Sequence, residues 1–248
     1  MAFVTPEVQI FPDPAALADA AARTVVEAAR AAVGARDRFT LVLAGGETPR
    51  ETYRRLAAPP LAEAMPWSRT WVFFGDERCV PPDHPASNYR MAAETLLSKV
   101  PLPPERVLRM AGEAEDPEAA AAEYARRLGE VLGTRRGELP RFDLVLLGMG
   151  LDGHTASLFP GSPVLRETFR PVVAVHAAQA VVPERITLTF PVLNAARHVV
   201  FLVAGPEKAR AVKAVLRDRA PLPAAMVAPE EGRLTWLLDR AAAALLEA

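Results

Sequence analysis

Cysteine is almost missing from the 248-residue sequence, which contains only Cys79. A single thiol excludes an intramolecular disulfide framework and any metal site built from several thiolates. Long apolar runs are missing too, and none approaches the roughly 20 residues that a transmembrane helix needs. The first residues also lack the charged and apolar regions of a signal peptide. We therefore expect a cytoplasmic protein that does not interact with a membrane.

An excess of positive charge is lacking as well, since 29 Lys and Arg residues face 30 Asp and Glu residues. Nucleic-acid-binding proteins need clustered positive charge to neutralise phosphates, so a general nucleic-acid binder is excluded. Internal repeats and low-complexity linkers are absent, and half of the residues are hydrophobic. The length and this composition predict one domain covering residues 1–248, as a monomer or a small homo-oligomer.

Short apolar, β-branched runs alternate with alanine-rich stretches that carry Arg and Glu. The runs predict strands at Val8–Phe11, Phe39–Ala44, Thr70–Phe74, Val107–Met110, Phe142–Leu147, Val172–Val175, Ile186–Thr189, Val199–Val203 and Ala225–Val227, with a late edge strand at Leu234–Leu238. The intervening stretches predict helices at Pro14–Ala35, Pro49–Ala57, Ser87–Lys99, Pro117–Leu132, Pro206–Asp218 and near Asp239–Leu246. Several of these helices begin with a capping residue followed by proline.

The central strands, with sequences such as LVLA, LVLL and VVFLVA, are apolar on both faces. This pattern is typical of a parallel sheet that helices cover on each side. We therefore expect a three-layer α/β fold with a mostly parallel sheet and right-handed crossovers. Ligands of such folds bind beyond the carboxyl ends of the strands.

Two strand ends carry features that suit an anion. In LVLAGGETPRETY, Gly45 and Gly46 let the backbone approach a ligand, and Thr48 adds a hydroxyl donor beside free N–H groups of a helical turn. A plain strand–turn–helix with Thr48 as the cap explains this segment equally well. Lys208, one of only three lysines, opens another helix, where a cation is unfavourable unless an anion is bound. A solvated lysine remains the alternative there.

Charged residues follow two further strands. Asp76, Glu77 and Arg78 come directly after the strand WVFF, where they either bind a polar substrate or pair with one another at the surface. In FDLVLLGMGLDGHTASLFPGSP, three glycines match G-x-G-x-x-G, but proline interrupts the segment before a long helix can form. We reject dinucleotide binding for this reason. The glycine-rich turn instead delivers Asp152 and His154, an orienting carboxylate and a general base.

Taken in order, these segments resemble the 6-phosphogluconolactonase family. The resemblance rests on GG-x-TP, GDER-x-VPP-x-H-x-x-SNYRMA, GMG-x-DGHTASLFPGSP, RITLTFPVLNAAR and G-x-x-KA, which run from about residue 40 to 213. That family belongs to a superfamily shared with glucosamine-6-phosphate deaminase and related to ribose-5-phosphate isomerase. The resemblance implies a modified Rossmann-like sheet and a cytoplasmic hydrolase that needs no cofactor or metal. Its partner would be a phosphorylated sugar lactone.

The resemblance also implies roles for individual residues. The reaction would be the hydrolysis of 6-phospho-D-glucono-1,5-lactone to 6-phospho-D-gluconate, step two of the oxidative pentose phosphate pathway. The residues implied in catalysis are His154, Asp152, Arg78 and Asp76, and those implied in binding substrate or phosphate are Gly45, Gly46, Thr48, Arg185 and Lys208. One position departs from the family, which often has Ser where this chain has Glu47. We expect the Glu47 carboxylate to turn away from the phosphate.

Two alternatives belong to other classes of function. A glucosamine-6-phosphate deaminase or sugar-phosphate isomerase would need a base near C2, a place that Asp76 could fill. Deaminases, however, resemble DGH-x-AFNEPG at the histidine motif, and Phe159 stands where their Glu falls. They also tend to have Tyr at the position of Arg78. A non-catalytic sugar-phosphate sensor would need a DNA-binding segment, and the sequence has no basic helix-turn-helix pattern.

Overall fold

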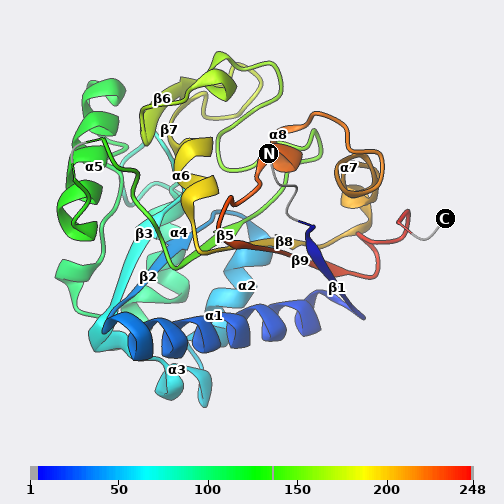
Figure 1. The fold of residues 1–248 in the computed structure, drawn as a ribbon, viewed down its shortest axis with the longest axis horizontal. Coiled ribbons are helices and arrows are strands. Elements are labelled where there is room, and N and C mark those ends of the chain that lie inside the picture. The colour runs from blue at the N-terminus through cyan, green and yellow to red at the C-terminus, as the bar shows by residue number, and fades with distance from the viewer. Residues whose placement is uncertain (1–4, 136, 247–248) are drawn as a thin grey trace.

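The computed structural model, which describes residues 5–135 and 137–246, is built on a six-stranded sheet (Figure 1). From one edge to the other, its strands are β1 (Glu7–Phe11), β9 (Arg233–Asp239), β8 (His198–Val203), β5 (Leu144–Leu147), β2 (Phe39–Leu43) and β3 (Thr70–Phe74). Every neighbouring pair of strands in this sheet is parallel. The predicted mostly parallel α/β fold is confirmed.

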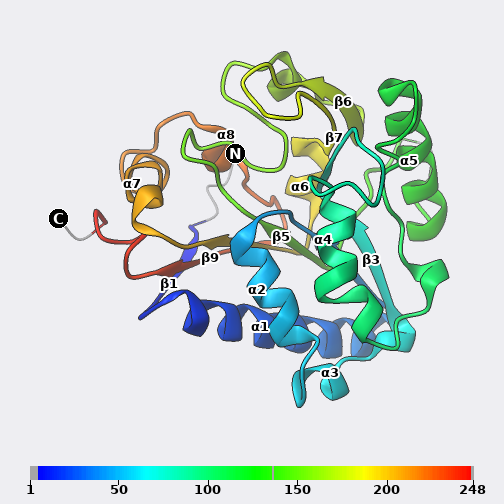
Figure 2. The same cartoon turned by 180° about the vertical axis from the view of Figure 1, so that it is seen from behind.

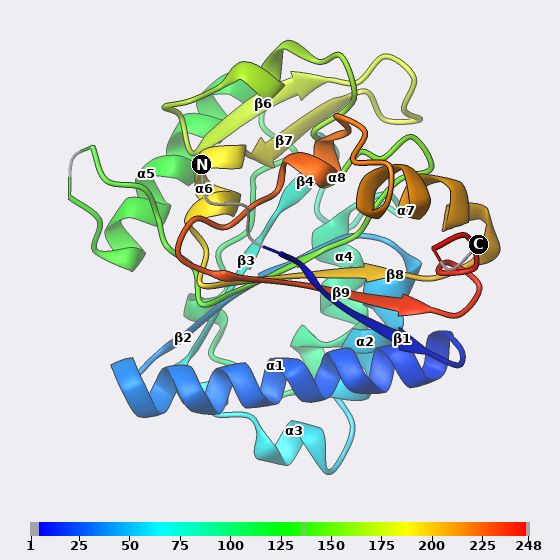
Figure 3. The ribbon, with the colours of Figure 1, turned by 45° about the vertical axis from the view of Figure 1, so that its right-hand side comes forward.

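The central strands bury both of their faces, as their continuous apolar sequences predict. Leu41 and Leu43 of β2 pack in one hydrophobic cluster, while Val42 between them packs in another on the opposite face. Helix α1 (Pro14–Arg36) covers the first face, and Figure 3 shows it running beneath the sheet. Its N-terminus is capped by Asp13, which accepts a hydrogen bond from the backbone N of Ala16 at 2.8 Å.

A second, three-stranded antiparallel sheet lies over the other face of the large sheet (Figure 3). Its strands are β4 (Asp76–Arg78), β7 (Glu184–Leu188) and β6 (Val172–His176), with β7 in the middle. The sequence predicts strands near β6 and β7 but not their separate sheet, and it predicts no strand at β4. This small sheet joins β4 to a segment more than 100 residues away, so local patterning does not reveal it.

The remaining helices cover the two faces. They are α2 (Glu47–Leu56), α3 (Leu61–Ala64), α4 (Asn88–Thr95), α5 (Pro117–Leu132), α6 (Phe190–Ala195), α7 (Ala209–Leu216) and α8 (Pro223–Met226), with short 3₁₀ turns at Trp67–Arg69, Leu97–Lys99, Pro104–Arg106, Pro163–Arg166 and Pro206–Lys208. Figure 2 shows α2 and α4 side by side. None of the helices within residues 5–135 and 137–246 is long and apolar enough to cross a membrane.

Three predicted elements are wrong, and the strand predicted at Leu234–Leu238 is present but not at the edge of the sheet. The expected strand Ala225–Val227 overlaps helix α8, whose alanines favour a helix and whose first residue is proline. The strand expected at 107–110 contributes only an isolated bridge between Val107 and Val72. Strand β9 lies inside the sheet between β1 and β8, not at its edge. The last expected helix, near 239–246, forms hydrogen-bonded turns, which begin where Asp239 accepts a bond from the backbone N of Ala242.

The topology brings four strand ends together at one edge of the sheet. Strands β8, β5, β2 and β3 are consecutive neighbours and parallel, so their carboxyl ends lie side by side. The double-glycine turn follows β2, the GMGLDGH turn follows β5, and Lys208 follows β8. The acidic pair of β4 comes directly after β3. These are the segments from which the sequence predicts a site.

At the opposite end of β8, His198 makes the stability of the fold depend on pH. Burial first, and then the Arg233 guanidinium, lower its pKa from 6.5 to about 4. The unfolded chain therefore binds a proton at higher pH than the folded protein, so stability is lost as the pH falls from about 6.5 toward 4. We expect the parent to lose about 2–3 kcal/mol more unfolding free energy between pH 7 and pH 4.5 than His198→Gln loses. Urea unfolding at both pH values measures this difference, and equal losses would contradict it.

Candidate active site

The converging strand ends enclose a cavity of about 610 Å³. Eight of the nine predicted site residues line it, namely Gly45, Gly46, Thr48, Asp76, Arg78, His154, Arg185 and Lys208. The ninth, Asp152, is not among the lining residues but contacts His154 directly. The structure therefore brings the predicted residues together in one place. Their roles in binding and catalysis stay predictions.

The double-glycine turn forms one wall of the cavity. A Cβ atom at Gly45 would lie 2.0 Å from Oδ1 of Asn88, so only glycine allows α4 to approach this closely. The end of β2 is held by the buried Tyr53, whose hydroxyl accepts a hydrogen bond from the backbone N of Ala44 and donates one to its carbonyl oxygen, both at 2.8 Å. Backbone N–H groups at the start of α2 therefore have a fixed position.

The sequence makes predictions for two side chains of this turn, those of Thr48 and Glu47. The helix begins at Glu47 with Gly46 as its N-cap residue, so Thr48 lies in the first helical turn and is not the cap. Glu47 has a side chain 80% exposed, and its carboxylate pairs with Nε of Arg50 at 3.2 Å. Glu47 also lines the cavity, so the expectation that its carboxylate turns away from the phosphate stays a prediction. An anion at the helix N-terminus would not face a bare negative charge.

Lys208 lines the cavity beyond the end of β8, next to Glu207. Its Nζ donates a hydrogen bond to the carbonyl oxygen of Met149 at 2.8 Å, which ties the β8 end to the β5 end. Burial lowers the pKa of this amine, while the carboxylates of Glu207 and Asp152 oppose the shift. An ammonium group held by one carbonyl keeps two further donors, which is suitable for an anionic ligand.

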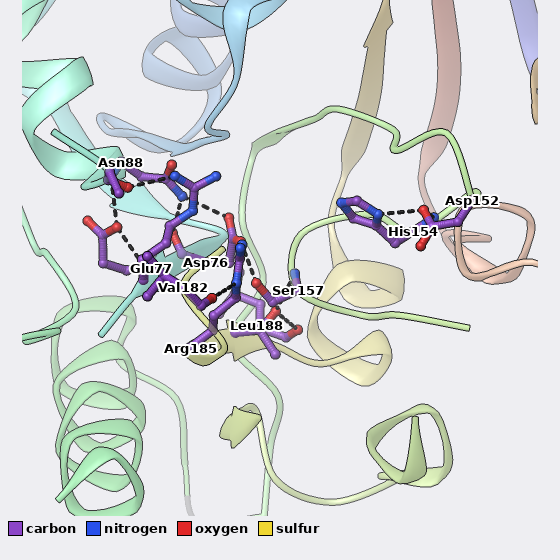
Figure 4. Close-up of polar contacts among 12 residues, drawn as sticks. Asp76, Glu77, Asn88, Asp152, His154, Ser157, Val182, Arg185 and Leu188 are labelled. Carbon is purple, nitrogen blue, oxygen red and sulfur yellow. Dashed lines mark hydrogen bonds and ion pairs between the residues drawn. The ribbon is translucent and has the colours of Figure 1, made fainter. Parts of the chain in front are cut away.

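The loop after β5 carries the His154 and Asp152 pair. Nδ1 of His154 lies 2.6 Å from Oδ1 of Asp152, and the same oxygen accepts a hydrogen bond from the backbone N of His154 at 3.1 Å (Figure 4). Burial works to raise the pKa of Asp152, but these bonds from His154 outweigh it and lower that pKa. An ionised Asp152 favours the tautomer with a proton on Nδ1. Nε2 is then the acceptor nitrogen of a general base.

Residues 148–162 form turns and contain no α-helix. The structure thus lacks the helix that a dinucleotide-binding fingerprint requires, which agrees with our rejection of that motif. The close packing of the loop explains one of its glycines instead. A Cβ atom at Gly150 would lie only 2.1 Å from Nδ1 of His154 and 2.6 Å from Oδ1 of Asp152. Gly150 leaves the space in which the pair forms.

The acidic residues of β4 are buried, so the surface pairing considered from the sequence is wrong. Oδ2 of Asp76 accepts a hydrogen bond from the hydroxyl of Ser157 at 2.6 Å, and Oδ1 accepts one from Nδ2 of Asn88 at 3.1 Å (Figure 4). Both carboxylate oxygens therefore have a fixed orientation. A carboxylate bound in this way is better suited to hold a neighbouring cation than to remove a proton from substrate.

Glu77 has a structural task on the other side of the strand. Its carboxylate accepts hydrogen bonds from the backbone N atoms of Asn88 at 2.7 Å and Tyr89 at 2.8 Å, at the first turn of α4. Burial raises the pKa of Glu77, and these backbone bonds counteract the shift only in part. Ser87 caps the same helix by accepting a bond from the backbone N of Arg90.

Arg78 and Arg185 are direct partners across strands β4 and β7. Nη1 of Arg78 donates to the carbonyl oxygen of Ala86 at 2.6 Å, while its buried Nε has no acceptor among the described residues. Arg185 donates through Nε to Val182 at 3.0 Å, and its Nη1 lies 4.0 Å from the carboxylate of Asp76. Burial lowers the pKa of Arg185, and Asp76 opposes this shift. Two cationic groups therefore line one side of the cavity.

Sequence reasoning missed Asn88 and Ser157, the two partners of Asp76. Both are polar and buried, and Asn88 is one of only two asparagines in the chain. The rarity of asparagine in the chain is the signal that could have identified Asn88 as a site residue. For Ser157 the only such signal is its position near His154 in the sequence. No three His, Cys, Asp or Glu side chains within the described ranges form a group that could hold a metal ion. That the reaction needs no metal or cofactor stays a prediction.

Comparison with known proteins adds a family match and close relatives. Residues 12–236 match a family model described as glucosamine-6-phosphate isomerases/6-phosphogluconolactonase. The human 6-phosphogluconolactonase is 42% identical over 244 residues, which cover 96% of this chain and 93% of the human protein. A probable chloroplastic 6-phosphogluconolactonase of rice (Oryza sativa subsp. indica) is 39% identical and covers 97% of this chain and 77% of its own length.

A solved structure with the same fold is that of 6-phosphogluconolactonase from Trypanosoma cruzi. It superposes with a TM-score of 0.87 and is 31% identical in sequence. The match covers 100% of this chain and 99% of the other. The similarity therefore includes the strands, the loops between them and the whole cavity region.

Proposed function

Since the chain belongs to the glucosamine-6-phosphate isomerase/6-phosphogluconolactonase family, we propose that it hydrolyses 6-phospho-D-glucono-1,5-lactone to 6-phospho-D-gluconate. The product is formed in the second step of the oxidative pentose phosphate pathway. One observation carries the proposal: the imidazole of His154 and the double-glycine turn line the same cavity. A base and an anion-binding turn within one cavity suit a phosphorylated substrate with a hydrolysable ester bond.

The phosphate of the substrate binds between the start of α2 and Lys208. Glu47 and Thr48, the first residues of α2, line the cavity, and free N–H groups and the positive end of the helix dipole at this terminus attract an anion. Nζ of Lys208, held at Met149, supplies a charged donor. Binding energy from the phosphate is used to position the lactone carbonyl beside His154.

Hydrolysis then proceeds through a water molecule activated by His154. Nε2 takes a proton from the water as its oxygen forms a bond to the lactone carbonyl carbon, C1. Oδ1 of Asp152, 2.6 Å from Nδ1, accepts the hydrogen bond from the Nδ1 proton and stabilises the imidazolium that forms. When the tetrahedral intermediate collapses, the bond from C1 to the ring oxygen breaks. The imidazolium returns its proton to that oxygen, so the base is regenerated.

The oxyanion of the intermediate needs a cation or N–H donors nearby. Arg78 and Arg185 line the cavity, and the buried Nε of Arg78 has no acceptor within the described chain. A guanidinium that is already desolvated gains more from a developing negative charge than one in water. Asp76 acts by fixing Arg185 and not as a base, because both of its oxygens accept hydrogen bonds. That arrangement disfavours deaminase or isomerase chemistry, which would use Asp76 at C2.

The experiment that tests this function follows the disappearance of freshly made 6-phosphogluconolactone with and without the protein. Spontaneous lactone hydrolysis is subtracted, and glucosamine 6-phosphate serves as the control substrate. We expect lactone loss to be accelerated in proportion to protein concentration, with no turnover of the amino sugar. Turnover of glucosamine 6-phosphate would favour the deaminase alternative, and binding of sugar phosphates without turnover would favour a sensor.

Replacing Lys208 by alanine tests the phosphate site. The loss of a charged donor is expected to raise KM roughly tenfold or more while kcat changes little, because the phosphate lies away from the reacting carbon. Steady-state kinetics measure both constants. Lys213→Ala is the matched control, since that lysine lies on α7 and pairs with Asp218 at 2.7 Å outside the cavity. An unchanged KM in Lys208→Ala would remove this residue from the phosphate site.

The cellular compartment, the domain count and the oligomeric state of the chain are also part of the proposal. We propose that it acts in the cytoplasm as one domain, residues 1–248, and as a monomer or a small homo-oligomer. The rice relative is named chloroplastic, so the compartment differs among members of the family. The near balance of 29 basic and 30 acidic residues supports a small-molecule partner over nucleic acid.

A further inference from the structure

The aromatic ring of Phe159 contacts two side chains of the proposed active site, those of His154 and Arg185. Its centroid lies 4.4 Å from that of the His154 imidazole, with the two planes inclined by 34°. The guanidinium carbon of Arg185 lies over the same ring, 5.7 Å from its centroid. Phe159 is half-buried and does not itself line the cavity. It therefore touches the proposed catalytic groups from behind and not the substrate.

His154 needs such a contact because its other side-chain contact leaves the ring free to move. The imidazole lies in a loop of turns, and the hydrogen bond from Nδ1 to Asp152 fixes only one edge of the ring. Asp152 itself has a side chain 44% exposed and is held through the same Oδ1 by the backbone N of His154. A rotation of the imidazole about the axis of its one Nδ1 hydrogen bond would move Nε2 away from the cavity. A ring packed against the imidazole face fixes its plane.

The contact also depends on the charge of the imidazole. The face of an aromatic ring carries partial negative charge and attracts cations more strongly than neutral groups. Arg185 is cationic throughout, whereas His154 becomes a cation only when it takes the proton from water. The imidazolium forms in a cavity lined by three cationic side chains and four carboxylates, with a fifth carboxylate, that of Asp152, adjacent to it. The cations are Arg78, Arg185 and Lys208, and the lining carboxylates are Glu47, Glu51, Asp76 and Glu207. The Phe159 ring therefore favours the transition state over the resting state.

We propose that Phe159 is a positioning residue for the reaction: its ring fixes the plane of the His154 imidazole and stabilises the imidazolium that forms during hydrolysis. This inference rests on the proposed function and on the role of His154 within it. It assigns a task to an aromatic side chain that neither binds the phosphate nor reacts. Phe159 acts through His154 and, by its contact with Arg185, links the β5 loop to strand β7.

The first test compares Phe159→Leu with Phe159→Tyr in the hydrolysis of 6-phosphogluconolactone. Leucine keeps an apolar side chain but removes the ring, so we expect kcat to fall about tenfold and KM to stay within about twofold. Tyrosine keeps the ring, so we expect its kcat to stay within about twofold of the parent. If Phe159→Leu does not fold, Phe159→Met provides a flexible apolar side chain without a ring.

The pH profile separates this role from simple packing. Without the ring the imidazolium is less stable, so His154 releases its proton more readily. The midpoint of the acid limb of kcat/KM should then move to lower pH by about half a unit in Phe159→Leu. Phe159→Tyr should keep the midpoint of the parent. A residue that only fills space would lower kcat without moving this midpoint.

Phe169→Leu is the matched control, because this phenylalanine lies ten residues further along the chain and is 85% exposed. We expect it to keep the kcat, the KM and the pH profile of the parent. An unchanged kcat in Phe159→Leu, or a lower kcat with an unmoved acid limb, overturns the proposal. Failure of the parent protein to accelerate lactone hydrolysis would instead overturn the proposed function, so the two failures are distinguishable.

Discussion

Replacing His154 by alanine is expected to lower the catalysed rate of lactone hydrolysis by about 10²–10⁴-fold. Among the described residues, His154 carries the only imidazole that lines the cavity, and both oxygens of Asp76 already accept hydrogen bonds. KM should change little, because the phosphate binds at the α2 end of the cavity and at Lys208. Initial rates with freshly made lactone, corrected for spontaneous hydrolysis, measure the loss in kcat.

His176→Ala is the control for this substitution. Its side chain is 61% exposed and contacts Glu184 on β7, away from the residues that line the cavity. We expect this variant to keep the activity of the parent. The acid limb of kcat/KM, present in the parent because the base must be unprotonated, should disappear in His154→Ala. Near-normal turnover by His154→Ala would reject the role of the imidazole.

Local sequence signals predicted those parts of the fold that depend on neighbours in the chain. Helix α5 has the two ends that the sequence predicts, Pro117 and Leu132; in the structure Asp116 caps its start, and Gly133 follows its last turn with a left-handed backbone. The strand expected at Ala225–Val227 failed because a run of three apolar residues does not distinguish a strand from a helical turn. The small antiparallel sheet was not predicted, because its strands β4 and β7 pair across a long distance in the sequence.

In the candidate site, too, the sequence showed the features that depend on neighbouring residues and not those that depend on distant ones. Glycines, a His–Asp pair and a rare lysine at strand ends were visible in the sequence, since parallel topology alone places strand ends together. The environment of Asp76 was not visible. Its partner Ser157 lies 81 residues away in the chain, so no local pattern shows that the carboxylate is buried and bound. Burial changes its expected role from a base to the anchor of a cation.

The geometry also explains why the Asp152–His154 pair requires a particular backbone conformation. Asp152 and His154 are two residues apart, and the turn between them is closed by bonds from Gly150 N to the carbonyl of His154 at 2.8 Å and from Gly153 N to the carbonyl of Gly150 at 3.1 Å. Both side chains then fold back over Gly150. A short loop can hold an acid–base pair in this way without a helix or strand beneath it.

Replacing Gly150 by alanine is therefore expected to have the second large effect, a fall in kcat of about 10²-fold. The added methyl carbon would lie 2.1 Å from Nδ1 and 2.2 Å from Cε1 of His154, and 2.6 Å from Oδ1 of Asp152. All three atoms belong to side chains that can rotate away, so the fold is retained while the pair is displaced. Steady-state kinetics and a thermal melt together measure this selective loss.

Gly148→Ala is the matched control in the same loop, because its added carbon would meet nothing closer than the carbonyl oxygen of Gly45 at 3.9 Å. That distance is an ordinary contact, so kcat should stay within about threefold of the parent. Equal losses in both variants would show that the loop tolerates no side chain at all. Parent-like kcat in Gly150→Ala would show that His154 works from another position than the one beside Asp152.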